Sequence, residues 1–423
     1  MFKKTILKNG LRVITIPQKN SRPVTVLVLA ATGSKYEEKE ISGISHLLEH
    51  MLFKGTKKRP DKIAISEPLD RVGGNYNAFT GKDYTGYYAK VDFENFDLAL
   101  DIISDIYLNS LIDEKELEKE KKVVIEEINM YYDQPASYVQ NLWDRVLYGD
   151  QPAGWDIAGT KKSVLGLKRE QLVDYMKRQY SALNTVVIVA GHIREHQEVI
   201  KKVEKYFSGI KKRKIIQKKP VIFKEQNYPK VILKNKKTDQ THFCLGVRGY
   251  NLFQSEKYPQ EMLALILGGM MSSRLFVKIR EEMGLAYYIK TESFSDPESG
   301  YLVTQAGVDN SKADKAISAI LEEYKRISEE KVPEEELEKA KEHFKGRMSL
   351  SLETSDAQAS FYGLQEVLKK EILTPEQIYA KIDKVDTDDV LRVAKNIFKP
   401  EKLNLAIIGP FKNKKRFQKL LKF

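Results

Sequence analysis

The chain has 423 residues, 42% of them hydrophobic, and its 71 lysines and arginines exceed its 59 aspartates and glutamates to give a formal net charge of +12. This composition excludes an intrinsically disordered chain and a bundle of membrane helices, and the length suffices for roughly two to four domains. The single cysteine, Cys244, cannot form an internal disulfide, so the composition does not indicate an oxidising compartment.

The N-terminal residues 5–16 are predicted to form two short strands around a turn at Asn9-Gly10. Lys8 and Arg12 interrupt the apolar positions of this segment, which argues against a signal peptide. No run of about 18 apolar residues follows that could span a membrane. Lysines and glutamates are mixed along the whole chain, without the clustered basic patch that nucleic-acid binding requires. We therefore expect a cytoplasmic protein that binds no nucleic acid.

Similar patterns occur in the two halves of the sequence. An acidic helical pattern begins at Asp113, and a matching one begins 220 positions later at Pro333. A strand, a turn and a returning strand are predicted over residues 77–88 and again over 293–302. These matches indicate an internal duplication.

The predicted fold class is α+β, with two tandem and similar α/β-sandwich domains. The apolar runs 24–30 and 185–190 are predicted strands of the first domain, and helical patterns of ten or more residues lie between such strands. A basic stretch flanked by Gly209 and Pro220 is the best candidate for a boundary. The predicted organisation is an N-terminal domain, a basic linker and a C-terminal domain, at residues 1–210, 211–226 and 227–423.

The first candidate site lies in the segment His46-Leu47-Leu48-Glu49-His50. In a helix, His46 and His50 would lie one turn apart on one face, where two imidazoles can bind the same ion. Glu49 borders that face, and the surrounding leucines indicate a buried helix whose polar residues need partners. Two ordinary buried histidines are the alternative interpretation, which the acidic residues described next disfavour.

A third metal ligand is expected from the acidic helix that begins near Asp113. At 100° per residue, Leu117, Val124, Ile128 and Tyr131 define an inward face. Glu127 and Glu120 border this face, whereas Glu126 points away from it. Glu127 is therefore the predicted ligand, and Glu120 is predicted to support the site from behind the ligands.

A second His-x-x-Glu-His pattern occurs at residues 192–196. It follows a predicted strand and Gly191, so His192 is expected in a turn and His196 at the start of the next helix. The two imidazoles would then not share a face, and no acidic helix with inward carboxylates follows. We predict that this second pattern is part of a surface turn rather than a catalytic site.

The first motif and the later Glu127 resemble the inverted zinc-binding motif of the pitrilysin family, which includes insulin-degrading enzyme and the mitochondrial processing peptidase. Gly43 and the segments 51–56 and 74–80 extend the resemblance, which covers essentially the whole chain. It implies that His46, His50 and Glu127 hold one zinc ion per chain. It also implies that Glu49 is the general base and that Glu120 supports the ligands.

The resemblance further implies how a substrate is held. The strand with Asn77, Ala78 and Phe79 would pair its backbone with an extended peptide. Arg280 and Tyr287, seven positions apart, would hold the substrate and assist at the scissile carbonyl. Aligning the repeats places Leu265 near His46, Gly269 near His50, Ala340 at Glu120 and Arg347 at Glu127, so the second half has lost every metal-directed residue.

Three functions are considered for a chain with these residues. The first is a zinc endopeptidase that cuts peptides or unstructured targeting segments in a closed chamber, with cobalt or manganese as alternative metals in vitro. The second is a noncatalytic structural or peptide-binding subunit. The third is an enzyme that needs an unlike partner to supply the Arg and Tyr, which is disfavoured because Arg280 and Tyr287 are present.

Family members that work as single chains carry four such domains around a chamber, and this chain supplies two. The resemblance therefore implies half of a clamshell. It predicts a homodimer, or a heterodimer with a related chain, in which Arg280 and Tyr287 of one copy reach the zinc of the other.

Overall fold

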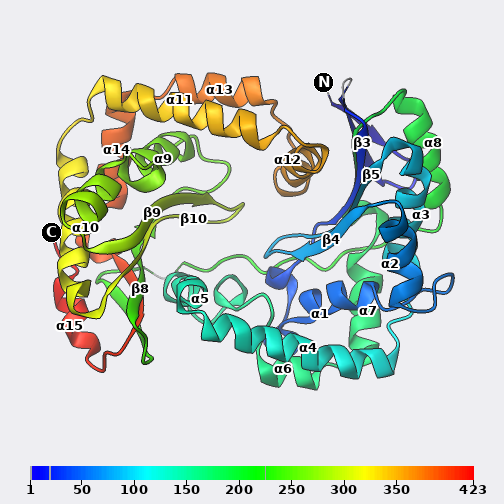
Figure 1. Cartoon of the computed structure of the whole chain (residues 1–423), viewed down its shortest axis with the longest axis horizontal. Coiled ribbons are helices and arrows are strands. Elements are labelled where there is room, and N and C mark those ends of the chain that lie inside the picture. Colours follow the sequence, from blue (N-terminus) through cyan, green and yellow to red (C-terminus); the bar gives the residue numbers. More distant parts are fainter. Residues whose placement is uncertain (1, 19–20, 224) are drawn as a thin grey trace. The chain divides into compact units, whose positions relative to one another are not determined.

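The computed structural model of the chain describes residues 2–18, 21–223 and 225–423. Its helices and strands, labelled in Figure 1, form two compact units. Unit 1 and unit 2 are each assembled from three stretches of sequence. Those of unit 1 are Met1–Asn129, Trp155–Lys219 and Ser349–Leu373, and those of unit 2 are Met130–Gly154, Pro220–Met348 and Thr374–Phe423.

Unit 1 is built on a six-stranded sheet in the order β1-β2-β6-β3-β5-β4. β2 and β6 pair in parallel, and the other neighbours pair antiparallel. The hairpin predicted around Asn9-Gly10 is confirmed, with Gly10 at φ 88° in the left-handed region that this turn uses. The strands of unit 1 are β1 (Lys3–Ile6), β2 (Arg12–Pro17), β3 (Pro23–Ala30), β4 (Asn75–Thr80), β5 (Thr85–Asp92) and β6 (Thr185–Gly191).

Strand β3 is apolar along nearly its whole length because both faces of the sheet are covered. Val26 and Val28 pack into the core beneath α1, α3, α7 and α8, whereas Leu27 and Leu29 pack on the opposite face with Tyr362 of α12. A strand buried on both faces has no polar side to alternate with. The helices of unit 1 are α1 (Ile44–Leu52), α2 (Lys62–Arg71), α3 (Phe96–Asn109), α4 (Glu114–Asp133), α6 (Lys161–Gly166), α7 (Arg169–Gln179), α8 (His196–Tyr206) and α12 (Ser355–Leu368).

The sheet of unit 2 repeats this arrangement. Its order is β7-β11-β8-β10-β9, in which one parallel pair, β7 with β11, again stands beside antiparallel neighbours. This matches the order of β2, β6, β3, β5 and β4 in unit 1, so the predicted duplication and the α+β class are confirmed. The strands of unit 2 are β7 (Lys230–Asn235), β8 (Gln240–Arg248), β9 (Ala286–Ser295), β10 (Gly300–Asp309) and β11 (Asn404–Gly409).

Each unit contains one helix that comes from the other half of the sequence. α5 (Pro135–Tyr148) comes from the first half of the chain but packs Trp143 and Leu147 against Cys244 and Ile408 of the unit 2 sheet. α12, from the second half, covers the unit 1 sheet. The compact units therefore differ from the contiguous domains 1–210 and 227–423, because helical periodicity does not reveal which sheet a helix covers. Unit 2 also contains α9 (Lys257–Ala264), α10 (Ala313–Glu329), α11 (Glu334–Ser351, whose last residues count with unit 1), α13 (Pro375–Asp383), α14 (Thr387–Ile397) and α15 (Lys414–Leu420).

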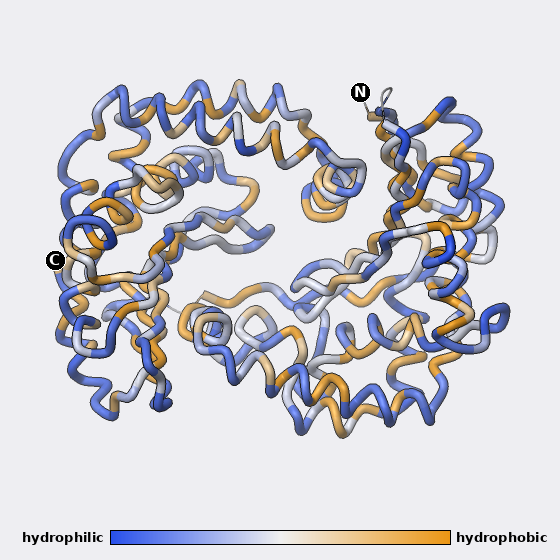
Figure 2. The backbone as a smooth tube through the Cα atoms, viewed as in Figure 1, coloured by the Kyte–Doolittle hydropathy of each residue, from blue (hydrophilic) through white to orange (hydrophobic). Residues whose placement is uncertain are grey.

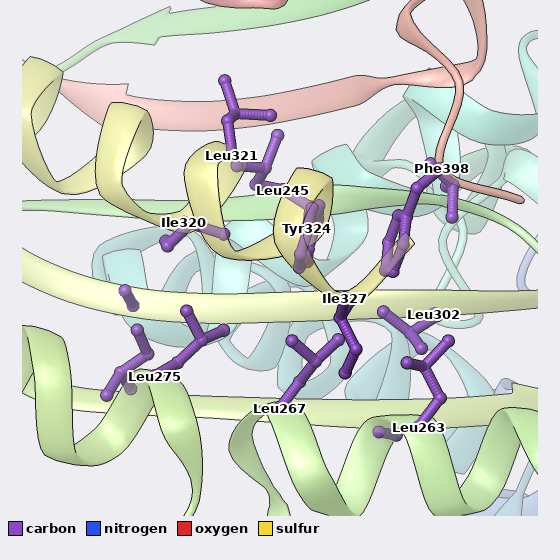
Figure 3. Close-up of a cluster of buried hydrophobic side chains, with 14 of the residues drawn as sticks. Leu245, Leu263, Leu267, Leu275, Leu302, Ile320, Leu321, Tyr324, Ile327 and Phe398 are labelled. Atoms are coloured by element: carbon purple, nitrogen blue, oxygen red, sulfur yellow. The ribbon is translucent and has the colours of Figure 1, made fainter. Parts of the chain in front are cut away.

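The core of unit 2 is drawn in Figure 3, where leucines of the α9 region and β10 face α10. Tyr324 of α10 stacks on Phe398 with ring centroids 4.2 Å apart. Its hydroxyl donates to the Leu245 carbonyl oxygen at 3.1 Å, so the one polar atom of this ring is satisfied inside the core. This packing gives unit 2 a core of its own.

The long helices are amphipathic rather than apolar throughout. Figure 2 shows hydrophilic and hydrophobic positions alternating along α4, whose buried residues include Leu117 and Val124. Across the described ranges, no helix combines the length and the apolar character needed to cross a membrane.

Candidate metal centre

A buried carboxylate holds the N-terminus of helix α1. Glu37 accepts hydrogen bonds from the backbone N–H groups of Gly43 at 2.7 Å and Ser45 at 2.9 Å. These donors belong to the group that a helix start leaves without intrahelical partners. Gly43 has φ 94°, and a Cβ there would lie 2.6 Å from the Ala158 carbonyl oxygen, so this position requires glycine. The helix that carries the first motif is thus fixed at its start.

The structure brings together the three predicted ligands, two from α1 and one from α4. Nε2 of His46 lies 3.7 Å from Oε2 of Glu127, and Nε2 of His50 lies 3.5 Å from the same oxygen. One ligand atom from each residue lies within 4.8 Å of the others, and no other such group occurs among the described residues. The side chains of His46, His50 and Glu127 are 12%, 21% and 24% exposed, so the cluster is largely buried but reaches solvent.

This geometry fits zinc. Zinc bonds of about 2.0–2.2 Å to nitrogen and oxygen place tetrahedral ligands roughly 3.4 Å apart. The two observed separations are within a few tenths of an ångström of that value. Two imidazoles and one carboxylate also leave a fourth coordination position, as catalytic zinc sites do. The number of ions per chain stays a prediction.

Glu120 lies directly behind the ligands, as predicted. Its Oε1 lies 3.0 Å from Nδ1 of His50, so this nitrogen can donate to Glu120 while Nε2 of the same ring faces Glu127. Its Oε2 lies 2.6 Å from Nζ of Lys54. Lys54 follows the end of α1 by two residues, and no pattern in the sequence predicts its contact with Glu120.

Electrostatics in this cluster distinguish the two histidines. Burial and the neighbouring His50 lower the pKa of His46 to about 4. Burial also lowers the pKa of His50, but its bonds to Glu120 and Glu127 outweigh burial and raise the pKa to about 9. For Glu127, the hydrogen bond from His50 lowers the pKa, so this carboxylate is ionised at neutral pH. His46 and Glu127 therefore already hold the protonation states that metal ligands need.

Glu49 stands beside the ligands without being one of them. Its Oε2 accepts a hydrogen bond from the Thr80 hydroxyl at 2.5 Å. Burial raises the pKa of Glu49, and the bond from Thr80 acts in the opposite direction. A carboxylate whose pKa lies above its ordinary value holds a proton more readily, which suits a group that accepts and releases one. No pattern in the sequence predicts this contact of Thr80, although the residue lies directly after the predicted substrate residues Asn77, Ala78 and Phe79.

The predicted orientation of α4 is mostly confirmed. Leu117 and Val124 are buried, Glu127 reaches the ligand cluster and Glu126 is exposed. The prediction for Tyr131 is wrong, because this side chain is 42% exposed. The helix continues past the unit 1 core at that point, so its periodicity no longer reports burial in that core.

The second His-x-x-Glu-His pattern forms no metal group. His196 is the first residue of α8, and both of its ring nitrogens contact threonine hydroxyls, those of Thr5 at 2.8 Å and Thr15 at 2.7 Å. His192 lies in the bend after β6, where its ring packs against Phe93 with centroids 4.2 Å apart. This arrangement agrees with the predicted turn and helix start.

The predicted substrate strand is an edge strand. β4 contains Asn77, Ala78 and Phe79 and pairs only with β5 among the described strands. The backbone N–H of Ala78 donates to the side-chain oxygen of Asn77 at 2.8 Å. This exposed edge therefore offers backbone groups to another chain.

Arg280 and Tyr287 both lie in unit 2, where each is accessible. Arg280 is in the π-helical segment η7 (Phe276–Glu282), and its guanidinium lies 4.8 Å from the centre of the Phe276 ring. Tyr287 is the second residue of the edge strand β9 and is 76% exposed. Unit 2 lacks counterparts of the predicted ligands, and its described residues contain no other group that could hold a metal ion.

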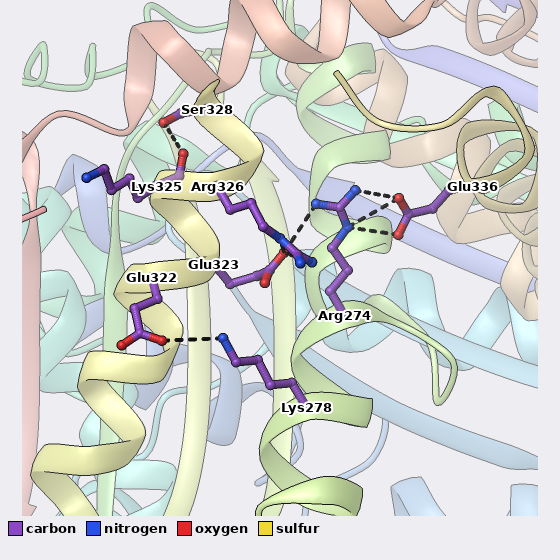
Figure 4. Close-up of polar contacts among 8 residues, drawn as sticks. All are labelled: Arg274, Lys278, Glu322, Glu323, Lys325, Arg326, Ser328 and Glu336. Carbon is purple, nitrogen blue, oxygen red and sulfur yellow. Dashed lines mark hydrogen bonds and ion pairs between the residues drawn. The ribbon is translucent and has the colours of Figure 1, made fainter. Parts of the chain in front are cut away.

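A network of charged residues fixes the start of the segment that carries Arg280. Figure 4 shows Arg274 between two carboxylates. It donates to Glu336 of α11 at 2.6 Å and to Glu323 of α10 at 3.2 Å. Glu323 is 1% exposed and also accepts from Arg326 at 2.9 Å. Arg274 therefore joins its own helical segment to α10 and α11, and the buried Glu323 is paired with two cations.

Comparison with known proteins gives two family matches in tandem. The family model described as Insulinase (Peptidase family M16) matches residues 12–161, which include the whole ligand cluster. The Peptidase M16 inactive domain matches residues 166–344. The chain belongs to peptidase family M16. It is a metallopeptidase by this membership, and the resemblance noted in the sequence is confirmed.

Relatives of this M16 peptidase match it from end to end. The chain is 36% identical to the uncharacterized zinc protease YmxG of Bacillus subtilis, over 98% of this chain and 99% of the relative. It is 34% identical to an uncharacterized zinc protease of Rickettsia felis, over 97% and 98% of the two chains.

Solved structures confirm the fold. A protease from Helicobacter pylori superposes with a TM-score of 0.88 at 24% identity, covering 97% of the M16 peptidase chain and 100% of the other. A chain of Complex III2 from Candida albicans superposes with a TM-score of 0.85 at 19% identity, covering 100% of each. A likeness of this kind shows the fold and leaves the activity to the site residues.

Proposed function

We propose that this M16 peptidase is a zinc-dependent endopeptidase that cuts peptides or unstructured targeting segments. The observation that carries the proposal is the convergence of His46, His50 and Glu127 with the unligated Glu49 beside them. Three ligands and an adjacent carboxylate base are the parts that metal-assisted peptide hydrolysis needs. The names of the relatives, as zinc proteases, agree with this chemistry.

Each residue has a distinct role in the proposed reaction. His46, His50 and Glu127 would hold zinc, which when bound supplies Lewis-acid polarisation of the scissile carbonyl and a lowered pKa for water. Glu49 accepts the proton of the attacking water and delivers it to the leaving nitrogen. Because Oε2 of Glu49 is engaged by Thr80, the free Oε1 is the atom that we expect to hold this proton.

The proposed substrate binds as an additional strand beside β4. Asn77, Ala78 and Phe79 belong to that edge, and main-chain pairing would let peptides of different sequence bind. The bond from the Ala78 N–H to the Asn77 side chain occupies a donor that an incoming carbonyl could use. We propose that the Asn77 side chain turns away when a peptide pairs with β4.

A noncatalytic structural or peptide-binding role is the second candidate. The likeness to a chain of Complex III2 favours it at the level of the fold. The M16 inactive domain, however, matches the part of the chain that follows the ligand cluster, and the cluster itself is complete. The intact cluster is the reason to prefer the peptidase.

We further propose that two copies of this chain, or this chain and a related one, work together around a closed chamber. Support comes from the resemblance, in which four domains of this kind surround the substrate, and from the two domains matched here. In this arrangement, Arg280 and Tyr287 act on the peptide held at the zinc of the other copy.

Digestion of an unstructured peptide by the purified chain and by Glu49→Gln tests the proposed function, with zinc measured on both. We expect both proteins to bind zinc and only the wild type to cut the peptide. Equal cleavage by the two would exclude Glu49 as the base. A wild type that binds zinc and cuts no peptide would favour the peptide-binding role.

A further inference from the structure

We infer that Thr80 is a positioning residue that orients Glu49 from the strand to which the substrate is proposed to add. The inference rests on the proposed function, in which Glu49 is the base. The Thr80 hydroxyl donates to Oε2 of Glu49 at 2.5 Å, and the two residues come from different elements, β4 and α1. A bond of this kind to a carboxylate is charge-assisted and therefore strong.

The direction of the Thr80 side chain follows from the strand. Successive side chains of a strand point to opposite faces, so Thr80 shares a face with Tyr76 and Ala78. Both of these pack against the unit 1 core that includes α1. Threonine is also branched at Cβ, which restricts χ1 and keeps the hydroxyl in one direction. The hydroxyl is thus aimed at the helix that carries Glu49.

The turn after Thr80 is fixed in place. The carbonyl oxygen of Gly81 accepts from the N–H of Ser34 at 3.3 Å, and that of Lys82 accepts from the N–H of Lys35 at 3.0 Å. Nζ of Lys35 lies 2.7 Å from Oδ2 of Asp83, with side chains 1% and 6% exposed. The end of β4 therefore cannot shift without breaking a buried ion pair and two backbone bonds.

One strand consequently serves two tasks. Its edge offers main-chain groups to the substrate, and its last side chain holds one oxygen of the base. A carboxylate held at one oxygen presents the other in a fixed direction, which lowers the reorganisation needed before proton transfer. We expect the loss of this bond to slow the chemical step more than it weakens peptide binding.

Two substitutions at Thr80 separate orientation from packing. Thr80→Val keeps the shape and removes the hydroxyl, and Thr80→Ser keeps the hydroxyl. We expect Thr80→Val to lower kcat about tenfold or more, with KM within about threefold and bound zinc unchanged. Thr80→Ser should retain at least about half of the wild-type kcat. Thr5→Val is the matched control, since the Thr5 hydroxyl bonds a side chain at the opposite edge of the same sheet.

Three outcomes would overturn the inference in these measurements. Equal losses in Thr80→Val and Thr80→Ser would indicate a packing role, and an unchanged kcat in Thr80→Val would show that the bond is dispensable. Loss of zinc by Thr80→Val would likewise assign the residue to the stability of the ligand cluster.

A second measurement is independent of any activity. Thermal unfolding is compared for Thr80→Val, Glu49→Ala and the double variant, each against the wild type. We expect Thr80→Val to lower Tm in the wild-type background and to have a smaller effect once Glu49 is absent. If Thr80→Val lowers Tm equally with and without Glu49, the bond between the two residues does not contribute to stability, which would contradict the inference. If Glu49→Gln cuts peptides as well as the wild type, the proposed function fails. The comparison of the single and double variants by thermal unfolding still decides whether Thr80 and Glu49 interact.

Discussion

Nζ of Lys54 lies 2.6 Å from Oε2 of Glu120, and the opposite oxygen of that carboxylate holds the ring of His50. Lys54 thereby fixes a buried carboxylate that in turn orients His50, one of the predicted metal ligands. We expect Lys54→Met to weaken zinc binding about tenfold, because Glu120 would lose the cation that holds it in place. Lys57→Met is the control, since Lys57 is an exposed lysine of the same loop. Equal zinc affinities of the two variants, measured by competition with a chelator, would contradict this role.

Adjacent glutamates on α4 provide a direct test of the third ligand. Glu127 belongs to the ligand cluster, whereas Glu126 is exposed. Glu127→Gln removes the anionic ligand, and we expect at least a hundredfold loss of zinc affinity with loss of peptide cleavage. Glu126→Gln changes the net charge equally and should leave both unchanged. Elemental analysis after dialysis measures the metal, and retention of zinc by Glu127→Gln would exclude Glu127 as a ligand.

The ligand cluster was predictable because it depends on local periodicity. His46 and His50 share a helix face by spacing alone, and the apolar stripe of α4 separated Glu127 from Glu126. Helical spacing could not predict the contacts of Lys54 and Thr80. The first depends on how the loop after α1 packs against α4, and the second on how the end of β4 packs against α1. Neither residue differs in the sequence from an ordinary surface lysine or strand threonine.

The exchange of α5 and α12 is a second case that periodicity could not resolve. Each helix shows an apolar face, with Trp143 in α5 and Tyr362 in α12, but a face indicates burial and not the partner. A short connection favours packing of a helix near the element before it. By that rule α5 would cover the unit 1 sheet and α12 the unit 2 sheet, which is the reverse of what the structure shows. The prediction that Tyr131 faces inward is wrong for a related reason. The unit 1 core, which this side chain was expected to join, ends before residue 131.

The stability of unit 1 should depend on pH through Glu37. Burial raises the pKa of Glu37 to about 7, although the bonds from Ser45 and Gly43 oppose this shift. In the unfolded chain, the pKa returns toward its ordinary value of 4.5. Between these two values the folded state binds the additional proton, so the free energy of unfolding decreases as the pH rises from 5 to 8. We expect this contribution to be about 2 kcal/mol.

Glu37→Gln removes the titrating group and isolates its effect. Urea unfolding of both proteins at pH 5, 6, 7 and 8, with a chelator present, gives the difference in the free energy of unfolding at each pH. We expect the variant to become more stable relative to the wild type as the pH rises. Parallel profiles would show that Glu37 titrates at the same pH in the folded and unfolded chains.

Arg274 and Arg280 belong to one segment but are expected to act differently. Arg274→Met leaves the buried Glu323 with one cation fewer, so we expect a loss of about 3 kcal/mol in stability. Arg280→Met removes an accessible guanidinium and should lower peptide cleavage with little change in stability. Denaturant unfolding and peptide digestion of both variants measure the two effects. A large stability loss in Arg280→Met would indicate that this residue is structural.

Mixing two variants that are each expected to cut peptides poorly tests whether Arg280 acts on the zinc of a second copy. Glu49→Gln lacks the proposed base but keeps Arg280, and Arg280→Met has the opposite defect. In a dimer of this kind, a mixed pair contains one site with a wild-type Glu49 and a wild-type Arg280 from its partner. We therefore expect the mixture to recover up to about a quarter of the wild-type activity after subunit exchange, since half of the dimers are mixed and each has one complete site. A fully active wild type that is monomeric by light scattering, or a mixture that stays inactive although its subunits exchange, would contradict this arrangement.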